Sequence, residues 1–73
     1  MGNRLDQQVI SPREIEVLNL LCKGMTAKEI ATQLYISQHT VVSHRKNLIT
    51  KLEARNSLHM AYLAVTRGLL ALL

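Results

Sequence analysis

Residues 26–52, TAKEIATQLYISQHTVVSHRKNLITKL, decide the fold of this 73-residue chain. Thr26 and Glu29 have the spacing of a capping box, which predicts a short helix from there to about residue 34. Ser37 is a good N-cap for a second helix, residues 38–52. Only a short segment separates the two helices, so it must form a tight turn. Two capped helices joined in this way predict a helix-turn-helix.

A further helix is predicted before this pair. Ser11 can cap it, Pro12 suits its first position, and Glu14 can complete a second capping box. Gly24 marks its end, because glycine readily takes the left-handed conformation that closes a helix. The apolar residues at helical spacing, which predict one buried stripe, are Ile15, Leu18, Leu21 and Cys22. We therefore expect Cys22 to be a small buried side chain.

A fourth helix is predicted near the C-terminus. Asn56 or Ser57 can cap it, and Gly68 can end it just after Arg67. The apolar side chains expected to line the last three helices are Ile30, Ala31 and Leu34, then Val41, Leu48, Ile49 and Leu52, then Leu58, Ala61, Tyr62 and Val65. No strand pattern competes with these helices. The sequence therefore predicts an all-α fold, a four-helix domain with a central helix-turn-helix.

The composition allows one small domain. We expect residues 1–10 to be an N-terminal arm or linker and residues 11–73 to be the folded unit. A hydrophobic content of 48% argues against disorder. Cys22 is the single cysteine, no apolar stretch approaches the roughly 18 residues of a membrane span, and no secretory signal opens the chain. These features predict a cytoplasmic protein with no membrane partner.

Positive charge gathers on the helix predicted at residues 38–52. The whole chain carries a formal charge of +4, and this helix contains Arg45, Lys46 and Lys51 with no acidic residue. A basic stripe on one helix is typical of a surface that binds a polyanion such as DNA. An ordinary solvated helix face has the same appearance, so charge alone leaves both interpretations open.

Enzymatic chemistry is not indicated. The sequence has no glycine-rich phosphate loop, no paired carboxylates at a useful spacing, and no nucleophile motif. His39 and His44 would lie about 140° apart around their helix, which is unsuitable for a shared metal ion. We therefore predict that the protein is not an enzyme and needs no metal and no cofactor.

Two longer stretches, GMTAKEIA at residues 24–31 and ISQHTVVSHR at residues 36–45, resemble the LuxR/FixJ/GerE family of bacterial transcription regulators. SPREIEVL at residues 11–18 is similar to that family's first helix, and Lys51-Leu52 with Arg55 and Asn56 is similar to the end of its recognition helix. The resemblance runs from about Ile10 to Leu70. It implies a sequence-specific DNA-binding transcription regulator, with double-stranded DNA as its partner.

Site residues follow from the resemblance by position. The residues after the family's Thr-Val pair face the major groove, which makes Val42, Ser43 and Lys46 the expected base contacts. Val42 departs from the family pattern, in which a basic or polar residue is common. The expected contacts to the DNA backbone are Thr26, Lys28, Thr40, His44, Arg45 and Lys51. Thr26 and Ser37 have helix capping as an alternative role.

The last helix has an expected role in assembly. The resemblance implies that a homodimer forms on DNA through this helix, with Leu58, Ala61, Tyr62 and Val65 in the interface. In the alternative, the apolar tail at residues 69–73 folds back over the core. RNA polymerase is a further possible partner.

Other functions remain open at this point. A sigma-factor region 4 shares the helix-turn-helix, although Thr40-Val41 followed by His44 favours the LuxR type. A protein–protein adaptor could instead use the apolar helix at residues 57–67. Within the family, the segment fits either the DNA-binding effector of a response regulator or ligand-sensing regulator, or a short stand-alone regulator.

Overall fold

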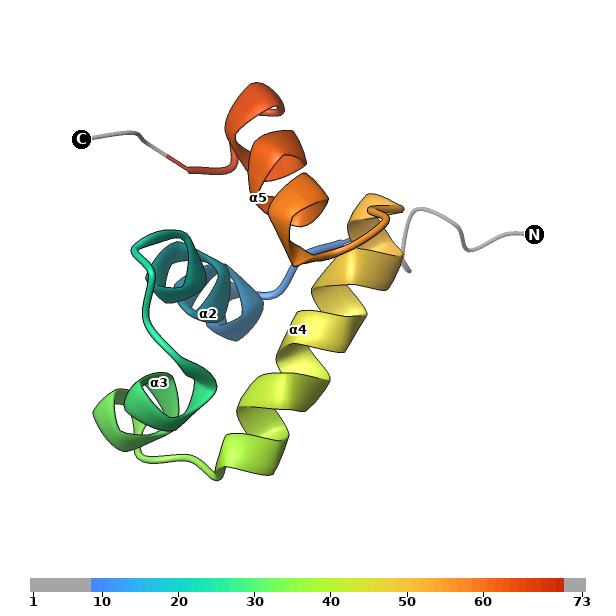
Figure 1. Ribbon diagram of the computed structural model, residues 1–73. Coiled ribbons are helices and arrows are strands. Elements are labelled where there is room, and N and C mark those ends of the chain that lie inside the picture. The colour runs from blue at the N-terminus through green and yellow to red at the C-terminus, as the bar shows by residue number, and fades with distance from the viewer. Residues whose placement is uncertain (1–8, 71–73) are drawn as a thin grey trace.

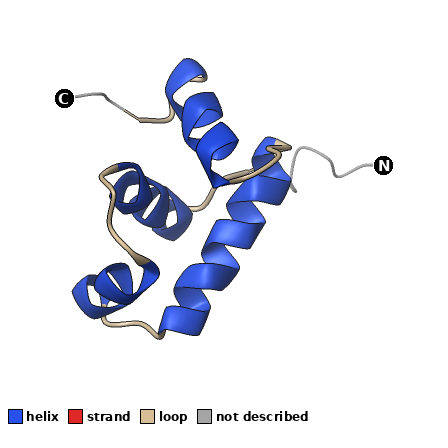
Figure 2. Cartoon of the chain, in the orientation of Figure 1, coloured by secondary structure: helices blue, strands red, loops and turns tan. Residues whose placement is uncertain are grey.

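A computed structural model describes residues 9–70 of the chain. This part contains the helices α2 (Pro12–Cys22), α3 (Ala27–Leu34), α4 (Gln38–Leu52) and α5 (Ser57–Thr66), and no strand among the described residues (Figures 1 and 2). The predicted all-α fold with a central helix-turn-helix is confirmed. The division into an arm at residues 1–10 and a domain at residues 11–73 stays a prediction, because residues 1–8 and 71–73 lie outside the described part.

The long helix α4 is the centre of the packing. It contacts α2, α3 and α5, while α2 and α3 also contact each other. Figure 1 shows α4 along one side of the molecule, with the shorter helices arranged against it. The buried core draws on all four helices: Val17, Leu18 and Leu20, then Ile30 and Ala31, then Val41, Leu48 and Leu52, then Met60 and Ala64. The orientation of α4 is therefore fixed by contacts with every other helix.

The predicted caps explain where the helices begin. Ser11 accepts a hydrogen bond from the Glu14 amide, and Thr26 accepts one from the Glu29 amide, each within a complete capping box. Ser37 caps α4. Of the two candidates for α5, Asn56 is the cap. These side chains satisfy backbone N–H groups that have no partner within the helix.

Residues in the left-handed backbone conformation follow the helices. Gly24 and Gly68 adopt positive φ angles of 88° and 74°, as expected from their places after α2 and α5. Two non-glycine residues do the same, Tyr35 with φ 59° after α3 and Glu53 with φ 55° after α4. A left-handed tyrosine is unexpected, because its Cβ crowds the backbone in this conformation. The turn between α3 and α4 is thus tight at the cost of local strain.

Two predictions about burial are wrong. Cys22 lies exposed at the end of α2, because the buried stripe of that helix is formed by Val17, Leu18 and Leu20. On α5 the core contacts are Met60 and Ala64, so the stripe expected from Leu58, Ala61, Tyr62 and Val65 faces away from the core. Apolar residues occur on nearly every side of α5, so periodicity could not show which side the core would take.

The tail after α5 folds back in part. Leu69 and Leu70 are half-buried and pack against the hydrophobic core. The remaining residues of the predicted tail lie outside the described part. None of the described helices is long and apolar enough to cross a membrane.

Candidate nucleic-acid interface

Helix α4 has a buried face and an outward face. Val41, Leu48 and Leu52 are almost completely buried against the other helices. Because successive residues of an α-helix turn by about 100°, the opposite side carries His39, Ser43, Lys46, Asn47 and Thr50. All of these are exposed except Ser43, which is half-buried. The outward face is therefore lined by side chains that donate or accept hydrogen bonds.

The three predicted base contacts lie on or beside this face. Lys46 is exposed near its centre, Ser43 is half-buried one turn earlier, and Val42 is half-buried at its edge. Helical geometry brings Val42 and Lys46 to one side, since they are four residues apart. The structure thus groups the three residues around one surface of the helix-turn-helix.

Two members of the outward face, Asn47 and Thr50, were not predicted from the sequence. Both are exposed, and Asn47 lies one turn after Ser43. The 3.6-residue period, counted away from Val41 and Leu48, would have found them. The predicted base contacts instead followed the family pattern, which places them just after Thr40-Val41.

The beginning of α4 is ordered by a pair of hydroxyl groups. Ser37 Oγ accepts the Thr40 amide at 2.9 Å, and the two side-chain oxygens lie 2.8 Å apart. Both residues are within the first turn, where free N–H groups and the helix dipole favour an anion. Thr40, an expected backbone contact, therefore has a fixed hydroxyl beside the positive end of α4.

The beginning of α3 presents a second group of expected backbone contacts. Thr26 and Lys28 are both exposed. Thr26 Oγ1 accepts the Glu29 amide at 3.1 Å, and Glu29 Oε1 accepts the Thr26 amide at 2.8 Å. Capping therefore occupies one acceptor position of Thr26, while its hydroxyl hydrogen remains able to donate.

Lys51 lies apart from the other expected backbone contacts. Its ammonium nitrogen is 2.8 Å from Oε1 of Glu14 on α2, and the Lys51 side chain is only 24% exposed. Glu14 is 4% exposed, and its Oε1 also accepts the Ser11 amide at 2.9 Å. Lys51 is thus partly exposed and paired with Glu14, and its contact with phosphate stays a prediction.

The charge of Glu14 is stabilised despite its burial. Burial alone would raise the pKa of this carboxyl group, but hydrogen bonds from Lys51 and Ser11 and the charge of Lys51 hold the pKa below its ordinary value. The ion pair therefore connects the first turn of α2 to the last turn of α4.

His44 and Arg45 occupy the flanks of α4. Both are half-buried, and helical geometry places them nearer to Val41 than to the centre of the outward face. Their positions suit contacts at the edge of a groove better than contacts with base edges. Among residues 9–70, no three His, Cys, Asp or Glu side chains are grouped as they would be around a metal ion.

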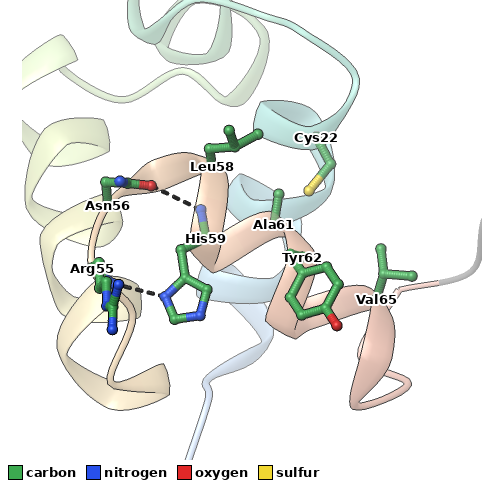
Figure 3. Close-up of a pocket in the computed structure, with 8 residues that line it drawn as sticks. All are labelled: Cys22, Arg55, Asn56, Leu58, His59, Ala61, Tyr62 and Val65. Atoms are coloured by element: carbon green, nitrogen blue, oxygen red, sulfur yellow. Dashed lines mark hydrogen bonds between the residues drawn. The ribbon is translucent and has the colours of Figure 1, made fainter.

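The residues expected at the dimer interface form one surface on α5. Leu58 is 82% exposed and Tyr62 is 64% exposed. Together with Ala61 and Val65 they line an open hollow of about 830 Å³. Figure 3 shows its remaining lining residues, which are Cys22, Arg55, Asn56 and His59. Cys22 is exposed overall, but the side chains around its thiol remove part of its water and raise its pKa.

Comparison with known proteins places this fold in a family. Residues 8–64 match the family model GerE, described as bacterial regulatory proteins of the luxR family. The chain belongs to this family. A solved structure of the transcription factor GerE is similar, with a TM-score of 0.81 and 33% sequence identity over 84% of this chain and 91% of that chain.

Curated relatives agree with this assignment. The oxygen regulatory protein NreC of Staphylococcus haemolyticus is 35% identical over 63 residues, and NreC of Staphylococcus aureus is 36% identical over the same length. The aligned region covers 86% of this chain but only 29% of each relative. The chain is thus a LuxR-type DNA-binding domain of transcription regulators, a family of DNA-binding factors and not of enzymes. The similarity favours this assignment over a sigma-factor region 4.

Proposed function

We propose that this domain recognises a specific duplex sequence by placing α4 in the major groove. The observation that carries the proposal is the division of α4 into a buried apolar face and an exposed polar face. The major groove, roughly 12 Å wide, admits one α-helix and displays a distinct pattern of donors and acceptors for each base pair. The packing of α4 against three other helices supports it as a rigid element for this task.

In this proposal the base contacts are Val42, Ser43 and Lys46. Lys46 donates to guanine O6 and N7, Ser43 bonds to either base type, and Val42 touches a thymine methyl group. Asn47 extends the same surface, because a side-chain amide can pair with adenine N6 and N7. The outward face then has a different chemical preference at each position along the groove.

Contacts to the DNA backbone set the register of the helix. We assign them to Thr26 and Lys28 at the start of α3, to Thr40 at the start of α4, and to the flanking residues His44 and Arg45. The starts of both helices supply N–H groups and a positive dipole end, which favour phosphate. Such contacts hold the protein in place and carry no sequence information.

A second copy of the chain is the proposed partner for α5. The surface formed by Leu58, Ala61, Tyr62 and Val65 is apolar, with Leu58 and Tyr62 exposed and Ala61 and Val65 half-buried, and a two-fold axis would bring it against itself. Two domains paired through α5 would present two α4 helices to two half-sites of DNA. The expected operator is therefore a repeat with two-fold symmetry.

The setting of the domain follows from this function. We propose that it acts in the bacterial cytoplasm, without catalytic activity of its own, as the DNA-binding part of a transcription regulator. The length of the NreC relatives is consistent with a sensor or receiver domain in the whole protein. Contact with RNA polymerase is a further proposal for the DNA-bound state.

The test is selection of bound duplexes from a random pool, followed by titration of the selected duplex at two salt concentrations. We expect a defined sequence with two half-sites, and a loss of affinity of about tenfold or more for a few-fold rise in salt. Enrichment of no sequence would contradict specific recognition. Binding that is indifferent to salt would contradict the assigned phosphate contacts.

A further inference from the structure

The turn that joins α3 to α4 contains a tyrosine in an unfavourable conformation. The amides of Tyr35 and Ile36 both donate to the Ala31 carbonyl, which requires the left-handed conformation of Tyr35, with φ 59°. Glycine or asparagine takes this conformation at a lower cost in free energy. Because Tyr35 is 94% exposed, burial does not offset that cost. The fold therefore gives no reason for a tyrosine here, and strained residues of this kind are characteristic of functional sites.

Tyr35 shares an open hollow with the exposed side of α3. The hollow measures about 590 Å³, and its other lining residues are Lys28, Glu29, Thr32 and Gln33. Lys28 is one of the proposed contacts to the DNA backbone. The carboxylate of Glu29 is engaged in the helix cap, where its Oε1 accepts the Thr26 amide at 2.8 Å. The surface around Tyr35 is therefore continuous with the proposed DNA interface at the start of α3.

The length of α4 brings the turn close to phosphate in the proposed complex. At 1.5 Å per residue, the 15 residues of α4 span about 22 Å. Because the major groove winds around the duplex, a helix of this length keeps only its middle at the base edges, and its ends approach the phosphates. Tyr35 comes two residues before Ser37, the N-cap of α4, and Figure 1 shows this turn at the start of the helix. A phenol hydroxyl at this place can donate to a phosphate oxygen.

We infer that Tyr35 is a further contact to the DNA backbone, through a hydrogen bond from its hydroxyl to a phosphate oxygen. The inference rests on the proposed placement of α4 in the major groove and adds a residue that neither the family resemblance nor the helical period indicates. The contact carries no sequence information, as is general for phosphate contacts. Since the hydroxyl brings no positive charge to the phosphate, it releases no counterion and differs in this from Lys28.

The experiment compares wild type with Tyr35→Phe, which keeps the ring and the conformation of the turn and removes only the hydroxyl. Affinity is measured for the selected duplex and for its single-base variants, at two salt concentrations. We expect the dissociation constant of Tyr35→Phe to rise on the order of tenfold on every duplex, as the loss of one hydrogen bond to a charged group would produce. The salt slope should equal that of wild type, whereas Lys28→Ala should reduce it.

Two further variants separate a DNA contact from an effect on folding. Tyr35→Asn relieves the strain of the turn, so it should unfold at a higher temperature and yet bind every duplex more weakly. If Tyr35 served only the fold, stability and affinity would change in the same direction. Thr66→Val is the matched control, because it removes an exposed hydroxyl from the end of α5 and should leave the affinity for DNA unchanged.

The outcomes distinguish this inference from the proposed function. If wild type binds its selected duplex and Tyr35→Phe binds equally well, the role of Tyr35 is overturned and DNA recognition stands. A loss confined to the selected duplex would also overturn it, because that result indicates a base contact. A loss of affinity that accompanies a lower unfolding midpoint of Tyr35→Phe would assign the hydroxyl to the fold instead. Failure of the selection to enrich any sequence would overturn the proposed function, and the inference with it.

Discussion

Lys46 is the residue with the most direct prediction. Lys46→Ala should relax the sequence preference and reduce affinity for the selected duplex by about 1–3 kcal/mol, because it removes a donor from the centre of the outward face. Competition between the selected duplex and single-base variants measures this effect. An equal loss on all duplexes would show that Lys46 contacts phosphate instead. Asn47→Ala, one residue along the same face, provides the neighbouring comparison.

Two other lysines should behave differently from each other. Lys28 is exposed at the start of α3, so Lys28→Ala should weaken binding to every duplex and reduce the salt slope by about one phosphate contact. Lys51 is paired with Glu14, so Lys51→Met should leave the salt slope unchanged. Salt titration of both variants on one duplex is the measurement. A reduced salt slope for Lys51→Met would show that Lys51 contacts phosphate.

Between elements, the Glu14–Lys51 pair predicts a dependence of stability on pH. The pKa of Glu14 is lowered from 4.5 in the folded state, so its charge stabilises the fold above that pH and the stabilisation is lost as pH falls below it. The free energy of unfolding, measured by urea titration from about pH 6 to about pH 3, should therefore decline in wild type. Glu14→Gln should be less stable at pH 6 and decline less.

A matched control for this measurement lies on the same helix. Glu16 is exposed and its oxygen lies 3.3 Å from Arg13, in a surface pair that contributes little to stability. Glu16→Gln should therefore follow the wild-type pH curve. If Glu14→Gln also followed that curve, the buried ion pair would not be the source of the pH dependence.

The turn between α3 and α4 predicts a stabilising substitution. Tyr35 is left-handed and its side chain is 94% exposed, so no packing compensates for its strain. Asparagine tolerates this conformation better, and Tyr35→Asn should raise stability by about 1 kcal/mol. Thermal unfolding measures the change. An unchanged or lower midpoint would mean that the phenol ring stabilises the folded state despite its exposure.

At the scale of the whole molecule, substitutions can separate the role of α5 in folding from its proposed role in assembly. Tyr62→Ser on the exposed face should abolish self-association and leave the unfolding midpoint nearly unchanged at concentrations at which both proteins are monomeric. Met60→Ala on the buried face should lower stability by about 2–5 kcal/mol. Ultracentrifugation and thermal unfolding of both variants test this division. A monomeric wild type, or a dimeric Tyr62→Ser variant, would contradict the proposed interface.

Much of the architecture was predictable because it is encoded locally. The capping boxes at Ser11 and Thr26 and the N-cap at Ser37 fix where helices begin, and each involves residues only three positions apart. The side of α4 that faces the core was also predictable, since its apolar residues keep a clear period. Short-range hydrogen bonds and periodicity are the features that a linear sequence displays directly.

The features that escaped prediction depend on contacts between distant residues. The pairing of Lys51 with Glu14 could not be predicted, because the two residues are 37 positions apart in the sequence. The predicted buried side of α5 was wrong because that helix is apolar on almost every side. Only its packing against α4 determines that Met60 and Ala64 are buried. The exposed position of Cys22 follows from the same kind of choice on α2.

The ion pair between Glu14 and Lys51 also makes the two ends of the domain mechanically unequal. Ile10 shares a hollow with Lys51 and Leu52 and also with Arg67 and Leu69, which follow α5. Only on the N-terminal side is the backbone hydrogen-bonded, at Ser11, to the same carboxylate that holds Lys51. Tension applied through an attachment before Ser11 would therefore act on the end of α4. Tension applied after Leu70 would act first on α5. We therefore expect a tether joined before Ser11 to disturb α4, the proposed recognition helix, and one joined after Leu70 to disturb α5, the proposed pairing surface.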